Sequence, residues 1–92
     1  MQPAAFQEYI VSDHAAFEMK RRGISEDQVR TIIEQPEQRL PVREGREILQ
    51  SRIHTRDGLY LYRVVVDVDR SPAEVVTAYR TSKIDKYWRM QP

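Results

Sequence analysis

The hydrophobic period of this chain changes at Glu37. Before that residue, apolar side chains recur three and four positions apart, which is typical of amphipathic helices. After it, they recur at about every second position, which is typical of half-buried strands. With 92 residues, the chain is long enough for one hydrophobic core and too short for two. The sequence therefore predicts one α+β domain over residues 1–92, with its helices first and its strands after them.

Two helices are predicted before the change of period. The first covers residues 13–22 and ends at Gly23, because glycine adopts the left-handed conformation that stops a helix. The second begins with a capping box of the S-x-x-Q type at Ser25 and ends before Pro36. Residues 1–11 are expected to form an extended leader to the first helix.

Four strands are predicted after the helices, joined by turns that are short enough for hairpins. They cover residues 38–43, 47–54, 59–67 and 73–80. Short turns between consecutive strands favour an antiparallel meander. A short cationic helix or turn follows the last strand. Two helices can cover only one face of such a sheet, so the other face is expected to be partly open.

Several classes of protein are excluded by residues that the chain lacks. It has no cysteine, hence no disulfide, no thiolate zinc site and no cysteine nucleophile. Its two histidines lack metal-binding spacing, and no phosphate-binding glycine loop or nucleophile elbow is present. We therefore predict no metal and no cofactor. The sequence also shows no signal peptide and no apolar run long enough to span a membrane. A cytoplasmic protein with no membrane partner is expected.

The distribution of charge is more informative than its total of +1. From Arg80 onward there are four cations and one acid: Arg80, Lys83, Lys86 and Arg89 against Asp85. Fixed cations at the end of a strand suit a phosphodiester ligand. The same residues can equally form the solvated face of a terminal helix. Both interpretations stay open at the level of the sequence.

Further candidates lie within the strands. Arg52, Arg63 and Arg80 occupy three successive strands and would share one face if the strand registers allow it. Converging arginines can stabilise the negative charge of a phosphorane-like transition state without a metal. They can also be rim residues paired with acidic side chains. Tyr79 should face away from Arg80, because neighbouring residues in a strand point to opposite faces.

One histidine and three aromatic residues complete the candidates. His14 is expected in the first turn of the first helix, where it could act as a general base or acid, or simply pair with a nearby carboxylate. Tyr60, Tyr62 and Trp88 could stack on nucleic-acid bases, although aromatic residues at such positions more often belong to a core.

Two motifs resemble a known family. They are H-A-x-x-x-M-x-x-R-G-I-S, from His14 to Ser25, and V-V-T-A-Y-R-T-S-K-I-x-K-Y-W, which ends at Trp88. Both resemble a family of small bacterial proteins described as a domain of unknown function, of the DUF4258 type. That family is similar in layout to BrnT toxins and, more distantly, to RelE and ParE toxins. The resemblance implies a RelE/barnase-like fold, with two N-terminal helices on a four-stranded antiparallel sheet and a short C-terminal helix.

The resemblance also implies a function. It points to the toxin of a toxin–antitoxin pair, a metal-independent endoribonuclease in which a 2′-hydroxyl attacks the adjacent phosphate. The implied partners are RNA, either free or on the ribosome, a cognate antitoxin protein and, as an option, a second copy of the chain. On this sequence, His14 matches the helix-one histidine of that family, and Tyr79, Arg80 and Lys83 lie where related toxins place catalytic or RNA-binding groups, so these four are the candidate catalytic residues. The further candidate RNA-binding residues, which rest on the charge pattern and not on the resemblance, are Arg52, Arg63, Lys86 and Arg89.

One residue departs from the pattern of the family. Glu18 stands where an arginine would be expected, so the outer face of the first helix is not wholly cationic. Two other functions therefore stay open. The same fold could be a non-catalytic module that holds a protein or nucleic-acid partner on its exposed sheet face. It could also be a structural protein of a phage or mobile element.

Overall fold

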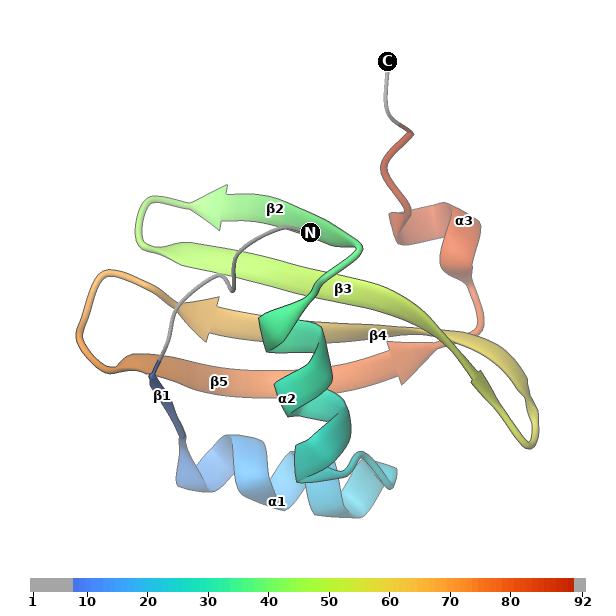
Figure 1. Cartoon of the computed structure of the whole chain (residues 1–92), viewed down its shortest axis with the longest axis horizontal. Helices are drawn as coiled ribbons and strands as arrows, with labels where there is room; N and C mark the ends of the chain where they lie inside the picture. The colour runs from blue at the N-terminus through green and yellow to red at the C-terminus, as the bar shows by residue number, and fades with distance from the viewer. Residues whose placement is uncertain (1–7, 91–92) are drawn as a thin grey trace.

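The computed structural model describes residues 8–90, and in these residues a five-stranded sheet is combined with three helices. The elements in chain order are β1 (Tyr9–Val11), α1 (Asp13–Arg22), α2 (Glu26–Glu34), β2 (Gln38–Arg43), β3 (Arg46–Thr55), β4 (Gly58–Asp67), β5 (Ala73–Thr81) and α3 (Ile84–Tyr87). Across the sheet the order is β1-β5-β4-β3-β2 (Figure 1). The predicted mixed α+β class is confirmed.

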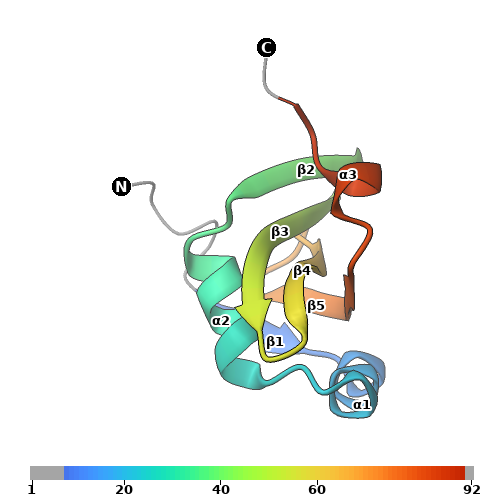
Figure 2. The same ribbon diagram turned by 90° about the vertical axis from the view of Figure 1, so that its right-hand side faces the viewer.

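Strands β2 to β5 form the predicted antiparallel meander, since each pairs with its neighbour in the chain. Figure 2 shows α2 on one side of this sheet and α3 on the opposite side. α1 packs along β5. We call the side that carries α2 the helix face and the side that carries α3 the open face.

The ends of α1 and α2 are set by the residues that the sequence indicates. Gly23 follows α1 with φ of 71°, a left-handed conformation that costs glycine nothing sterically. At the start of α2, the Ser25 hydroxyl accepts a hydrogen bond from the Gln28 backbone, and the Ser25 N–H donates to the Gln28 side chain. These reciprocal bonds satisfy two N–H groups that an uncapped helix would leave unpaired.

The core lies between the two longer helices and the helix face of the sheet. Its buried apolar residues are Ala15, Met19, Ile24, Val29, Ile32, Ile33, Leu49, Tyr62, Val64, Val66, Ala73, Val75 and Ala78. Fully burying one Val, Leu or Ile side chain contributes about 1.5–3 kcal/mol. Because both helices and three strands contribute to this one cluster, it fixes the N-terminal helices to the sheet.

The prediction of four strands is wrong by one, because the end of the predicted leader is itself a strand. β1 pairs in parallel with β5, with Tyr9 opposite Ala73 and Val11 opposite Val75. Tyr9 and Val11 pack against the core from the edge of the sheet, whereas Ile10 is half exposed. Three residues are too few to show a reliable alternation, so the sequence alone does not reveal this strand. Residues 1–7 of the leader lie outside the described residues.

A β-bulge in β5 decides which face its polar side chains occupy. Val75 pairs with Val66 and Thr77 pairs with Val65, so Val76 is an extra residue in the strand. One extra residue moves every later side chain to the other face of the sheet. As a result, Arg80 points to the helix face with Tyr62, its partner on β4. The registers therefore leave only Arg52 and Arg63 on a common face, and the arrangement in which Arg80 joins them is not formed.

Candidate functional site

A row of polar side chains crosses the open face of the sheet. Gln38, Gln50, Arg63 and Tyr79 are successive cross-strand partners on β2, β3, β4 and β5. Directly paired residues of antiparallel strands point to the same face, so these four side chains are neighbours. We call them the polar row.

Hydrogen bonds join the polar row from end to end. Gln50 Nε2 donates to Gln38 Oε1 over 2.8 Å, and Arg63 Nε donates to Gln50 Oε1 over 2.8 Å. Arg63 Nη1 then donates to the hydroxyl oxygen of Tyr79 over 2.6 Å. Each central side chain is thus held by a partner on either side, which fixes the position of the guanidinium group.

Arg63 is a buried cation with no carboxylate beside it. The residue is 7% exposed, and no ion pair within residues 8–90 includes it. Its guanidinium carbon lies 4.3 Å from the centroid of the Tyr87 ring. Such a cation–π contact is worth about 2 kcal/mol when it is desolvated. The neutral partners solvate this charge without cancelling it, so the polar row presents a positive potential to the surface above it.

The segment that contains α3 lies on the open face and is held there by the polar row. Gln50 Nε2 donates to the Tyr87 carbonyl over 3.2 Å. Gln38 bonds both backbone groups of Arg89: its Nε2 donates to the carbonyl over 2.5 Å, and its Oε1 accepts from the N–H over 3.0 Å. Two glutamine side chains therefore place the C-terminal residues of the described chain against β2 and β3.

The cations of this region differ from most other cations in the described chain. Seven arginines form ion pairs: Arg21, Arg22, Arg30, Arg39, Arg46, Arg52 and Arg70. Within residues 8–90 the cations outside ion pairs are Lys20, Arg43, Arg56, Arg63, Arg80, Lys83, Lys86 and Arg89. The last five come from β4, the end of β5 and the segment that follows it. The excess positive charge of the molecule therefore gathers at one end of the sheet.

Arg80 lies on the helix face, among tyrosines rather than carboxylates. Its Nη1 donates to the Tyr62 hydroxyl over 3.3 Å, and its guanidinium carbon is 4.7 Å from the centroid of the Tyr60 ring. The side chain is partly exposed. Arg80 and Arg63 thus have similar aromatic partners on opposite faces of the same strand pair.

His14 is exposed in the first turn of α1, apart from the polar row. The start of α1 lies by the first half of β5, because the Ser12 N–H donates to the Val75 carbonyl. The end of α1 lies further along the strand, where Arg22 Nη1 donates to the Ala78 carbonyl over 2.8 Å. Eight residues of helix, about 12 Å, separate His14 from that contact. The structure therefore does not bring His14 together with Arg80.

Glu18, one turn after His14, is a partner for several cations of α1. The hydrogen bond from Arg21 is the main reason that the pKa of Glu18 lies below its usual value, and the charges of Arg22 and His14 act in the same direction. This helix face is a local ion-paired surface, as expected from the acidic residue at that position.

Arg52 lies on the open face, two residues after Gln50 of the polar row on β3. Its guanidinium carbon lies 4.1 Å from the centroid of the Trp88 ring. Glu37 accepts from Arg52 Nε over 3.1 Å and from Nη2 over 3.0 Å, and these bonds are the main cause of a lowered pKa at Glu37. The predicted RNA-binding residue is thus an ion-paired residue that also covers an aromatic ring.

Three members of this site were not among the sequence candidates: Gln38, Gln50 and Tyr87. The two glutamines are almost fully buried, at 6% and 0% exposed. Their pairing depends on the β2–β3 register, which shifts by one between Pro41 and Arg43. A buried glutamine in the middle of a strand was the available signal, because such a residue needs a polar partner.

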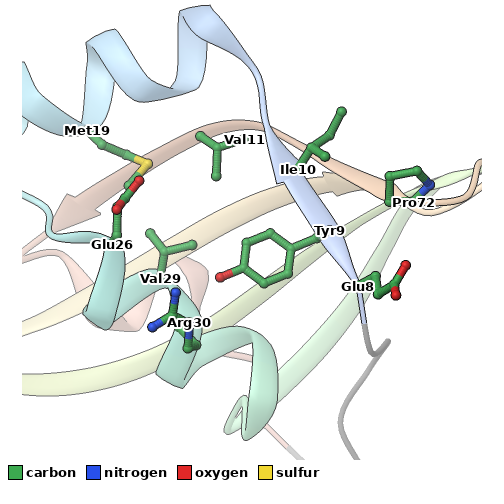
Figure 3. Close-up of a pocket in the computed structure, with 9 residues that line it drawn as sticks. All are labelled: Glu8, Tyr9, Ile10, Val11, Met19, Glu26, Val29, Arg30 and Pro72. Atoms are coloured by element: carbon green, nitrogen blue, oxygen red, sulfur yellow. The ribbon is translucent and has the colours of Figure 1, made fainter.

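A separate cleft of about 520 Å³ lies at the opposite edge of the sheet (Figure 3). β1, α1 and α2 form it, and Tyr9, Met19 and Val29 are among the residues that line it. Figure 3 shows the Tyr9 side chain extending toward α2, with Glu26 and Arg30 at the rim. None of the candidate catalytic or RNA-binding residues lines this cleft.

Two absences hold for the described part of the chain. Residues 8–90 contain no group of three or more His, Cys, Asp or Glu side chains that could hold a metal ion. Among the same residues, no helix has both the length and the apolar character needed to cross a membrane.

Fold and site together define a small α+β domain whose two longer helices pack against one side of the sheet and whose other face carries a buried arginine in a polar row. The model of the family described as "Domain of unknown function (DUF4258)" matches residues 11–80, which is more than half of the chain. The chain belongs to this family, as its two motifs indicate. Comparison with curated proteins gave no match, and neither did comparison with solved structures. The likeness to BrnT, RelE and ParE toxins stays a prediction.

Proposed function

We propose that this domain binds the phosphate backbone of RNA at the C-terminal end of β5 and cleaves it without a metal ion, as the toxin of a toxin–antitoxin pair. One observation carries the proposal. Five cations from β4, the end of β5 and the segment after it have no carboxylate partner within residues 8–90, although most arginines of the described chain do. Unpaired cations near a phenol are a suitable environment for a phosphodiester. The order of two helices followed by an antiparallel meander agrees with the finer RelE/barnase-like class, which is part of the same proposal.

In this proposal Tyr79 contacts the reacting phosphate, and Arg63 positions Tyr79. Arg63 is too buried to offer much surface to a ligand, whereas Tyr79 is partly exposed. The Tyr79 hydroxyl oxygen accepts a hydrogen bond from Arg63, so its own proton remains free to be donated. A phenol held in this way can give its proton to a leaving oxygen.

The proposed step is an internal displacement at phosphorus. The 2′-oxygen bonds to phosphorus, the bond from phosphorus to the 5′-oxygen breaks, and the products are a 2′,3′-cyclic phosphate and a 5′-hydroxyl. The leaving 5′-oxygen takes its proton from Tyr79. The proton of the 2′-hydroxyl passes to water, because His14, the base expected from the sequence, lies apart from the polar row. Exposed Lys83 and Lys86 would stabilise the extra negative charge on phosphorus.

Arg80 contributes differently in this arrangement, because it lies on the helix face. It would hold the phosphate of a neighbouring nucleotide where the RNA passes the end of β5. Arg89 would act on the open face, since it is exposed and follows the aromatic pair Tyr87 and Trp88.

The reaction is tested by incubating the protein with RNA in EDTA, with and without ribosomes. We expect cleavage that leaves cyclic phosphate ends and that is reduced in Tyr79→Phe, Arg80→Ala and Lys83→Ala. Arg43→Ala is the matched control, because Arg43 is an arginine outside the ion pairs of residues 8–90 and ends β2 at the other end of the sheet. If no RNA is cleaved under any of these conditions, the proposed reaction is wrong.

A second candidate function is a binding module without catalysis. The distance of His14 from the end of β5 favours it, because no other base candidate lies in the polar row. The two candidates differ in what they predict for the wild-type protein and for Tyr79→Phe. Cleavage by the wild type that is lost in Tyr79→Phe, with RNA binding retained, supports the enzyme, whereas RNA binding without any cleavage by the wild type supports the module.

The toxin role is tested in cells. Expression of the chain should arrest growth, co-expression of a small protein encoded by a flanking gene should relieve the arrest, and Tyr79→Phe should be tolerated. If cells grow normally on expression but the purified protein cleaves RNA, the protein is an RNA-cleaving enzyme and the toxin role is wrong.

A further inference from the structure

A second cleft, of about 690 Å³, lies at the β2 edge of the open face. Trp88 and Arg52 line it, together with Arg39, Arg89 and Glu37. Its charged lining residues are therefore three arginines and one carboxylate, so the cleft carries an excess of positive charge. Of the residues that line this cleft, the proposed function uses only Arg89.

The three arginines of the cleft are not equivalent. Arg39 donates to Glu47, and Arg52 makes two side-chain hydrogen bonds to Glu37. Arg89 forms no ion pair within residues 8–90. Arg89 is also exposed, and its backbone is fixed by Gln38. It is therefore the arginine of this cleft that can bind an incoming anion without losing a partner.

Trp88 supplies an aromatic surface beside this cation. The ring is only partly buried, and the guanidinium carbon of Arg52 lies 4.1 Å from its centroid. A base, an aromatic ring and a guanidinium plane stack well on one another. An indole with a free cation next to it suits a ligand that has both a flat π-surface and a negative charge.

We infer that this cleft binds one unpaired base of single-stranded RNA, stacked on Trp88, with Arg89 on the adjoining phosphate. This inference rests on the proposed function and narrows its substrate class. Bases within an RNA duplex are already stacked on their neighbours, whereas the bases of a single strand can turn outward onto an aromatic side chain.

The polar row connects this cleft to the proposed reaction site. Gln38 lines the cleft and begins the row, and Tyr79 ends the row three strands away. With neighbouring strands about 4.8 Å apart, the span is about 14 Å. A single strand of a few nucleotides can cover that distance, so the base in the cleft would belong to a nucleotide near the cleaved phosphate and not to the cleaved one itself.

The experiment uses the intrinsic fluorescence of Trp88, which is the single tryptophan of the chain. The full chain is titrated in EDTA with a single-stranded 2′-O-methyl RNA, which binds like RNA but cannot undergo 2′-hydroxyl attack. We expect saturable quenching of Trp88 by the single strand and none by a duplex of the same length at the same concentration.

Variants test the contacts by anisotropy of the labelled oligonucleotide. Trp88→Ala should bind roughly 5- to 150-fold more weakly, which is the range for loss of one base–aromatic stack, and Trp88→Phe should recover part of this affinity. Arg89→Gln should lower the slope of log affinity against log salt by roughly 0.7, as for one phosphate contact to a single strand. Arg43→Gln is the matched control and should bind like the wild type. Circular dichroism verifies that each variant is folded.

The outcomes separate this inference from the proposed function. Cleavage of RNA without quenching, and with equal affinity in folded Trp88→Ala, overturns the base site and leaves the reaction intact. Quenching with Trp88-dependent binding, but no cleavage of ordinary RNA, supports the base site and removes the reaction. Quenching by a poly-glutamate peptide in place of RNA would assign the cleft to an acidic protein partner and overturn the inference, and absence of any RNA binding overturns both.

Discussion

Arg63 donates a hydrogen bond of 2.6 Å to the hydroxyl of Tyr79, its direct partner across β4 and β5. The Tyr79 ring also meets the Tyr87 ring edge-on, with centroids 6.5 Å apart and planes at 76°. Edge-to-face pairs of this kind contribute about 0.5–1.5 kcal/mol beyond burial. Tyr79 is therefore held at its hydroxyl and at its ring, which fixes the position of its hydroxyl oxygen.

Replacement of Tyr79 by phenylalanine tests whether that proton takes part in a reaction. The variant keeps the ring and its contact with Tyr87 but loses the hydroxyl. If Tyr79 is the general acid, the single-turnover rate of RNA cleavage should fall by roughly 10²- to 10⁴-fold. The affinity for RNA should change little, since the cations remain.

Tyr60→Phe is the control for this substitution. Tyr60 is a partly buried tyrosine on the helix face, next to Arg80. The Tyr60→Phe variant should cleave RNA at the wild-type rate. A Tyr79→Phe variant that is as active as Tyr60→Phe would take Tyr79 out of the mechanism.

Gln50 is the central link of the polar row, and its replacement by leucine should destabilise the fold. Its side chain bonds Gln38, Arg63 and the Tyr87 carbonyl. A buried polar group left without its partner costs about 1–3 kcal/mol. We therefore expect the free energy of unfolding to fall by about 2 kcal/mol or more, measured by urea denaturation.

The exposed helix variant Thr31→Val serves for comparison and should stay within about 0.5 kcal/mol of the wild type. In Gln50→Leu, greater exposure of Trp88 to a soluble quencher would show that the C-terminal segment has come away from β2 and β3. A Gln50→Leu protein as stable as Thr31→Val would mean that the polar row does not stabilise the sheet.

Asp67 should make the stability of the fold depend on pH in the acid range. Arg46 donates two hydrogen bonds to its carboxylate, of 2.6 and 3.2 Å, and these lower the pKa of Asp67. Burial opposes this shift, and the charges of Arg46, Arg70 and Arg43 add to it. A carboxyl with a lowered pKa in the folded state contributes stability that is fully present above its unfolded value of about 4 and is lost as the pH falls through the folded value.

The free energy of unfolding of the wild type should therefore decrease as the pH falls from about 5 to about 2. Asp67→Asn should be less stable at neutral pH and should lose less stability over the same range. Glu18 and Glu37 also have lowered pKa values, so part of the slope should remain in the variant. Identical slopes for the two proteins would contradict the assignment to Asp67.

Gly45 is a glycine at which an added side chain should be less tolerated than at Gly23. Its φ is 83°, and a Cβ there would lie 2.6 Å from Oδ2 and 3.0 Å from Cβ of Asp69. Gly23 has a similar φ of 71° but no atom within 4 Å of the same position. Both alanine variants bear the cost of a left-handed residue, about 1–2 kcal/mol. Gly45→Ala should lose more stability in urea denaturation, because Asp69 must also move; equal losses would show that this movement costs little.

The sequence by itself determined the local structure of this protein. Gly23, Ser25 and Pro36 set the ends of the helices, and the change of period at Glu37 divides helices from strands. These features depend on backbone conformation and on hydrogen bonds between residues close in the chain, so they can be predicted without knowledge of the fold. The same holds for the four longer strands and the short C-terminal helix.

Only the tertiary structure decided which side chains meet. The extra residue Val76 turns Tyr79 toward Arg63 and Arg80 away from it. The pairing of Gln38 with Gln50 likewise depends on a register shift next to a turn. Since side chains alternate with a period of two, one extra residue reverses the face of everything after it, and the cost of that residue is balanced by packing between distant parts of the chain. The local sequence does not show how these two energies compare. The polar row and the face of each arginine can therefore be seen only in the folded molecule.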